Sequence, residues 1–87
     1  MAKVIIIDPG KSKCGLVLAE IIEEKIYEAI ILKSELLENY VRTLIAAENI
    51  SQIIIGNGTT SREIREKLYF FRFFTYFGRN SVLRTTA

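Results

Sequence analysis

The fold is decided by residues 4–22, which read VIIIDPGKSKCGLVLAEII. Val4 to Ile7 is a β-branched run without polar alternation, which is typical of a central strand covered on both faces. Residues 14–22 form a second apolar run. Because the connection between the two runs is so short, we expect an antiparallel hairpin with Asp8 at the C-terminal end of its first strand.

The rest of the sheet follows outward from this hairpin. Residues 26–33, IYEAIILK, predict a third strand after a charged turn. Helical spacing of apolar side chains then predicts a helix over residues 35–48, with Ser34 as its N-cap. Residues 52–55 repeat the apolar strand pattern. The intervening helix suits a crossover to a strand that lies parallel to the first and beside it.

A second helix is predicted over residues 61–70, because Thr60 and Glu63 have the spacing of a capping box. The element order is then βββαβα. This order predicts an α/β fold with a mixed sheet, in which an antiparallel three-stranded meander is joined by a parallel fourth strand. Both helices are expected to pack on the sheet.

Length and composition indicate a single domain over residues 1–87. Of the 87 residues, 49% are hydrophobic and 25% are charged, so the chain should fold rather than remain disordered. We expect the core to lie within residues 3–68. Residues 69–87 form an atypical aromatic and basic tail, since no acidic residue follows Glu66. The last part of this tail, residues 80–87, is expected to have no regular structure.

Missing residue types narrow the chemistry. The chain has one cysteine and no histidine, which excludes an internal disulfide, a Cys/His zinc site and Ser–His or Cys–His nucleophiles. The net charge of only +2 means that any contact with nucleic acid must be local. The apolar run at the start is too short for a signal peptide or a membrane span. We therefore expect a soluble cytoplasmic protein with no membrane partner.

Asp8 is the sharpest candidate site residue. A carboxylate after a buried strand points into the crevice where open α/β sheets bind ligands, and its oxygens suit hard cations such as Mg²⁺. Asp8 is therefore a candidate catalytic and metal-binding residue. The alternative is structural, because Asp-Pro-Gly is also a common turn that an aspartate stabilises.

The loop after the first strand is a candidate phosphate site. It presents Gly10, Lys11 and Lys13, whose backbone N–H groups and ammonium groups could bind an anion. It does not have the order of a Walker loop. A solvent-exposed hairpin tip is the commoner reading of two lysines in such a loop.

A second candidate phosphate site is residues 56–61, GNGTTS. Asn57, Thr59 and Thr60 stand at the start of the predicted second helix, where anions are attracted. A strand-to-helix connection with a cap would explain most of this stretch. If the two apolar strands are neighbours, both loops lie at one edge of the sheet with Asp8.

Seven of the nine aromatic residues fall within residues 69–77. They could stack on nucleic-acid bases, with Arg72 and Arg79 on phosphates. Core packing or a surface for self-association is the favoured reading, because large aromatic side chains mostly bury apolar area.

Two of these stretches resemble a known family. VIIIDPGKSKCG at residues 4–15, followed by LVLA, resembles the opening hairpin of RNase H-like Holliday junction resolvases, especially the YqgF-like family. IIIGNGTTS at residues 53–61 resembles that family's fourth strand and the glycine-rich loop after it. The similarity covers residues 3 to about 68.

The resemblance implies an RNase H-like fold with strand order 3-2-1-4 and a fifth strand beyond the fourth. It also implies a nuclease that uses Mg²⁺ or Mn²⁺ to hydrolyse phosphodiester bonds in structured DNA or RNA. Asp8 alone matches the family's acidic residues, because the others are expected where this chain has its acid-free tail. We therefore expect an incomplete catalytic set, and poor cleavage or none. A shortened or altered C-terminus would account for it, and so would acidic residues supplied by other chains or a degenerated function.

Two other classes of function stay open. Actin-like sugar kinases and Hsp70-like ATPases share a strand-Asp-x-Gly hairpin, so the chain could be a phosphate- or nucleotide-binding fragment of that fold. It could also be a non-catalytic interaction module. Catalysis that requires Mg²⁺ and Asp8 would identify the nuclease, thermal stabilisation by nucleotide would identify the ATPase fragment, and the interaction module would show neither.

Overall fold

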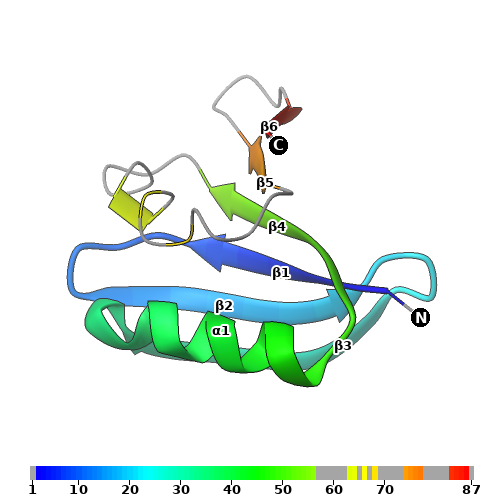
Figure 1. The fold of residues 1–87 in the computed structure, drawn as a ribbon, viewed down its shortest axis with the longest axis horizontal. Helices are drawn as coiled ribbons and strands as arrows, with labels where there is room; N and C mark the ends of the chain where they lie inside the picture. Colours follow the sequence, from blue (N-terminus) through cyan, green and yellow to red (C-terminus); the bar gives the residue numbers. More distant parts are fainter. Residues whose placement is uncertain are drawn as a thin grey trace.

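A computed structural model describes residues 2–56, Glu63, Ile64, Glu66, Leu68 and the backbone of residues 74–77 and 83–86 (Figure 1). Their strands form one mixed sheet in the order β3-β2-β1-β4-β5-β6. The strands are β1 (Lys3–Asp8), β2 (Lys13–Glu20), β3 (Lys25–Lys33), β4 (Ile50–Gly56), β5 (Phe74–Phe77) and β6 (Leu83–Thr86). The predicted α/β class is confirmed, and so is the interior position of β1 between β2 and β4.

The first three strands form the predicted antiparallel meander. In the hairpin of β1 and β2, Asp8 pairs with Gly15. In the hairpin of β2 and β3, Lys13 lies directly opposite Lys33. Asp8 is thus the last residue of β1, as the sequence predicts.

The second strand ends at Glu20, two residues earlier than predicted. Ile21 and Ile22 lie in the following turn and are exposed. The Glu20 carboxylate accepts a hydrogen bond of 2.9 Å from the backbone N–H of Glu23, and Glu24 has a φ of 55° in the left-handed region. A turn closed by a carboxylate therefore overrides the apolar pattern of the two isoleucines.

The predicted helix over residues 35–48 is present but begins differently. A 3₁₀ turn, η1 (Ser34–Leu36), precedes α1 (Leu37–Ala47). The N-cap prediction for Ser34 is wrong, because the Ser34 hydroxyl donates to the Gly10 carbonyl oxygen at 2.8 Å instead of capping a helix. No helix in the described part of the chain is long and apolar enough to cross a membrane.

The chain returns through α1 to β4, which lies parallel to β1. Ile5 pairs with Ile53, and Ile7 pairs with Ile55. The parallel fourth strand is therefore confirmed on the side of β1 away from β2. As a consequence, β1 and β4 end at the same edge of the sheet.

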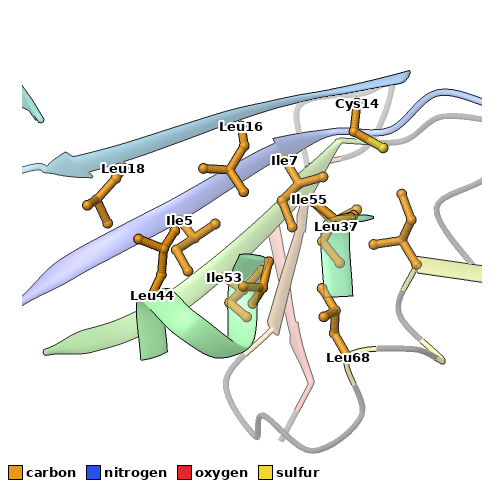
Figure 2. Packing of buried hydrophobic residues seen from close by; sticks show 12 residues of the cluster. Ile5, Ile7, Cys14, Leu16, Leu18, Leu37, Leu44, Ile53, Ile55 and Leu68 are labelled. Atoms are coloured by element: carbon orange, nitrogen blue, oxygen red, sulfur yellow. The ribbon is translucent and has the colours of Figure 1, made fainter. Parts of the chain in front are cut away.

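The hydrophobic core lies between the sheet and α1, which runs along one face of it (Figure 1). Figure 2 shows apolar side chains of the strands gathered with those of the helix. Alternate residues of each strand supply them, as the two-residue period of a strand requires. The cluster comprises Ile5, Ile7, Cys14, Leu16, Leu18, Leu37, Val41, Leu44, Ile53, Ile55, Ile64 and Leu68.

The opposite face of the sheet is only partly covered. Ile6 and Ile54 are partly exposed, although Ile5 and Ile53 beside them are fully buried. Ile31 of β3 is 76% exposed. The prediction that the first strand is covered on both faces holds only in part, because α1 packs on one face and on the other Val4 is buried while Ile6 is partly exposed.

Most of the predicted second helix, over residues 61–70, lies outside the described residues. Glu63, Ile64 and Glu66 have helical backbone, and the N–H of Leu68 donates to the carbonyl of Ile64 at 3.0 Å. Ile64 and Leu68 are buried in the core. The full length of this helix stays a prediction.

Two short strands extend the sheet beyond β4. β5 (Phe74–Phe77) is parallel to β4, and β6 (Leu83–Thr86) is antiparallel to β5. The expectation of no regular structure over residues 80–87 is wrong there, because β5 offers a partner to a segment with β-branched threonines. The aromatic side chains of the tail lie outside the described part of the chain, so self-association through them stays a prediction.

Candidate functional site

Asp8 lies where two parallel strands end side by side. It is the last residue of β1, and the neighbouring β4 ends at Gly56. The chain leaves β1 toward β2 on one side and returns as β4 on the other. Such a switch in strand order is where open α/β sheets place ligands. The Asp8 side chain is exposed at this position.

Glycines flank Asp8 on both neighbouring strands. Gly15 pairs with Asp8 on β2, and a Cβ atom at Gly15 would lie 3.5 Å from the Asp8 Cβ. A Cβ atom at Gly56 on β4 would lie 3.9 Å from Oδ1 of Asp8. Neither residue has a side chain, so the neighbouring strands do not cover the exposed carboxylate at these two positions.

A shallow groove of about 340 Å³ runs along the sheet face to Asp8. Asp8 alternates with the buried Ile7, so it shares the face of Ile6, opposite α1. Apart from Asp8, the groove is apolar. Its lining is Ile6, Asp8, Gly15, Leu16, Val17, Ala29, Ile30 and Ile31.

The loop after β1 is anchored to the start of η1. The N–H of Ser34 donates to the Ser12 carbonyl at 2.9 Å, and its hydroxyl donates to the Gly10 carbonyl at 2.8 Å. The Cys14 Sγ lies 3.2 Å from the same hydroxyl. Only glycine fits at position 10, because a Cβ atom there would lie 2.0 Å from the Lys13 carbonyl oxygen. These contacts tie the loop to the end of β3.

A second cavity of about 380 Å³, the lysine cleft, lies beside this loop. Two of its lysines come from the β1–β2 connection and the start of β2, and the third is the last residue of β3. Its lining is Lys11, Ser12, Lys13, Lys33, Ser34 and Glu35. None of these three lysines forms an ion pair with an acidic residue in the described part of the chain.

The sequence predicted Lys11 and Lys13 as candidate phosphate-binding residues but did not predict that Lys33 lines the same cleft. Lys33 joins them because the register of the β2–β3 hairpin places it opposite Lys13. The available signal was that the third apolar run ends in a lysine. Asp8 lines the groove and the lysines line the cleft, so these residues occupy two cavities. Both cavities are at one end of the sheet, since Gly15, the partner of Asp8, is two residues from Lys13.

Three other predicted phosphate-binding residues, Asn57, Thr59 and Thr60, lie outside the described residues. β4 ends at Gly56, immediately before them. Their convergence with Asp8 therefore stays a prediction.

Among the described residues that line the groove, Asp8 is the one carboxylate available to Mg²⁺ or Mn²⁺, the cofactors that the resemblance implies. Among the described residues, no group of three acidic, cysteine or histidine side chains is arranged to hold a metal ion. Mg²⁺ is usually held by one or two carboxylates plus substrate phosphates, and a two-metal centre needs more. Asp8 with its described neighbours thus does not make a complete two-metal centre.

In the described part of the chain, two hydrogen bonds of α1 and of the residue after it shift the pKa of an ionisable group. The Tyr40 hydroxyl of α1 donates to the Glu28 carboxylate of β3, and this hydrogen bond raises the pKa of Tyr40. The hydrogen bond with Glu48 raises the pKa of Lys3. These contacts join α1 and its C-terminal end to the sheet, so they are explained by the fold.

No family model matches this chain, and no curated protein or solved structure gives a match. Function is therefore inferred from the fold and from the two cavities at the end of β1.

Proposed function

We propose that this chain is an RNase H-like domain related to the YqgF-like resolvases, and that it binds structured DNA or RNA at the end of β1. The strand order supports this, because antiparallel β3, β2 and β1 continue into parallel β4 through a helix. The position of Asp8 carries the proposal. It ends the interior strand and is flanked by Gly15 and Gly56, which leaves it accessible to a large ligand.

The charges at this end suit a nucleic-acid backbone. With a net charge of +2, the chain cannot attract nucleic acid through its overall field and needs local cations. Lys11, Lys13 and Lys33 supply them next to the loop that follows Asp8. Phosphate contacts of this kind fix position and carry little sequence information, which fits recognition by shape.

Cleavage by this chain is expected to be slow or absent. Two-metal hydrolysis needs several carboxylates around metal ions about 3.5–4 Å apart. Asp8 supplies one, and the sequence has no acidic residue after Glu66. The proposed activity is therefore binding to branched or folded nucleic acid, with hydrolysis reduced or lost.

Binding is tested by titrating the isotope-labelled chain with a four-way DNA junction, a structured RNA, and a linear duplex with the same arm sequence. We expect tighter binding of the branched or folded molecules, and shifts of the amide signals of Asp8, Gly15 and Gly56. Equal affinity for the duplex, or shifts confined to the other end of the sheet, would contradict the proposal.

Hydrolysis is tested by incubating the same nucleic acids with the chain in Mg²⁺ or Mn²⁺. The matched control is Asp8→Asn, which keeps the size of the side chain and removes its charge. We expect no product above the control. Robust cleavage that the substitution abolishes would show that the chain assembles a full catalytic set.

A second candidate function is favoured by the lysine cleft beside the Asp-Pro-Gly hairpin, namely nucleotide binding by a fragment of an actin-like ATPase fold. A rise in melting temperature with Mg²⁺ and ATP, larger than the rise with junction DNA, would favour it. A chain that responds to neither ligand would be the non-catalytic interaction module.

A further inference from the structure

We infer that the lysine cleft is a phosphate-binding site that works without Asp8 and without a metal ion. Three lysines and one glutamate, Glu35, line it, so its charge is positive. Asp8 is not among its lining residues. Ammonium groups bind phosphate oxygens directly through charge-assisted hydrogen bonds.

The cleft is built before any ligand arrives. Ser34 holds the loop through two hydrogen bonds, to the carbonyls of Ser12 at 2.9 Å and Gly10 at 2.8 Å. The close approach of Gly10 to the Lys13 carbonyl sets the turn between them. A ligand therefore need not pay to order the backbone of this loop, which improves affinity.

The register of the sheet adds an argument for an anion. Lys13 and Lys33 lie directly opposite each other on β2 and β3, and like charges in such a pair are destabilising. No described acidic residue forms an ion pair with either lysine. A phosphate between them would turn the repulsion into two attractions, so binding should also stabilise the fold.

The phosphate can come from a nucleic-acid backbone or from a free polyphosphate. The cavity of about 380 Å³ is open enough for either. We assign the bound phosphate to a phosphodiester of a nucleic-acid backbone. Only this choice of the molecule that carries the phosphate rests on the proposed function. The cleft itself rests on the lysines and the anchored loop.

The first test measures binding of inorganic pyrophosphate to the full chain by calorimetry and by the rise in melting temperature. Lys33→Gln should weaken binding by about tenfold, the loss expected for one charged hydrogen bond. Lys33→Arg should restore most of it. Lys25→Gln is the matched control, because Lys25 is on the same strand at the other end of the sheet. Glu35→Gln should tighten binding.

The second test repeats the junction titration at several salt concentrations without a divalent metal. The logarithm of the binding constant falls with the logarithm of the salt concentration, and each phosphate contact adds about 0.9 to the steepness of this fall. Loss of one contact in Lys33→Gln should therefore make the slope shallower by about 0.9. Lys25→Gln should leave it unchanged. Circular dichroism confirms that each variant is folded.

The outcomes distinguish phosphate binding by the lysine cleft from nucleic-acid binding by the chain. Pyrophosphate binding that depends on Lys33, together with no binding of junction DNA, supports the cleft and rejects the proposed function. Junction binding that does not depend on Lys33, with equal pyrophosphate affinity in Lys33→Gln and Lys25→Gln, overturns the cleft and leaves the proposed function standing. Loss of pyrophosphate binding in Asp8→Asn would contradict the independence from Asp8.

Discussion

Lysines at the two ends of the sheet differ in whether they form an ion pair within the fold. At the start of β1, the Lys3 ammonium lies 2.5 Å from the Glu48 carboxylate and 4.1 Å from the centre of the Tyr27 ring. At the end of β1, Lys13 and Lys33 face each other, and neither pairs with an acidic residue in the described ranges. The charge of Lys3 is neutralised within the fold, whereas the charges of Lys13 and Lys33 are available to a ligand.

This difference separates residues that close the fold from residues that can serve a partner. Lys3 joins the first strand to the residue after α1, so its ion pair locks the helix end to the sheet. The ammonium groups of the cleft lysines form no ion pair with a described acidic residue, and one pair of them repels. Unpaired charge that costs stability is what a binding site needs before its ligand arrives.

The largest expected effect is the loss of stability when a side chain of the hydrophobic core is removed. Ile55→Ala removes a fully buried side chain beneath the candidate site and should lower the free energy of unfolding by about 2–5 kcal/mol. Ile54→Ala, next to it on the partly exposed face, should cost clearly less. Urea denaturation measures both. Equal losses would mean that the outer face is as well covered as the core face.

A smaller effect should be confined to the ligand end. Gly10→Ala places a Cβ atom 2.0 Å from the Lys13 carbonyl oxygen, so the loop must shift at a cost of about 1–3 kcal/mol. We expect NMR shifts around Ser12 and Ser34 and little change around Lys3. Unchanged stability and spectra would show that the loop is not held as the contacts indicate.

Substitution of a lysine should change stability in opposite directions at the two ends of the sheet. Lys33→Gln removes a like-charge pair and should raise stability by a few tenths of a kcal/mol at low salt. Lys3→Gln breaks the ion pair with Glu48 and should lower the melting temperature. Melting curves at low and high salt measure both, since screening should shrink both effects. Two changes of the same sign would contradict the contrast between the ends.

The smallest effect concerns acid stability at the turn after β2. The Glu23 N–H lowers the pKa of Glu20 from its ordinary 4.5, so Glu20 stabilises the fold above that pH and loses this contribution as pH falls through its lowered pKa. Hydrogen bonding and repulsion from Glu20 raise the pKa of Glu23, so its favourable contribution is lost as pH rises through the raised value.

At pH 7, Glu20→Gln should lower the melting temperature and Glu23→Gln should raise it slightly. Melting temperatures from pH 3 to 7 check this, and parallel profiles for both variants and the parent chain would refute it.

Local pattern was sufficient for the elements that position Asp8. The run VIII ending at Asp8 is a strand because β-branched side chains favour extended backbone, and the short connection after it forces an antiparallel partner. The apolar period of α1 and the second isoleucine run then require a parallel crossover. Strand order around β1 and the place of Asp8 therefore follow from the apolar pattern within each segment and from the lengths of the connections between them.

The lysine cleft, in contrast, depends on which residues of distant segments meet. Lys33 lies opposite Lys13 because of the register of the β2–β3 hairpin. A slip of one residue in this register would place the Lys33 side chain on the other face of the sheet. Ser34 looks like a helix cap by its position in the chain, but its hydroxyl goes to Gly10, 24 residues away. Ile6 and Ile54 look like core residues, yet α1 packs on the other face. Register and packing between segments are set by the whole fold, because each is a choice among several partners that the local sequence allows equally well.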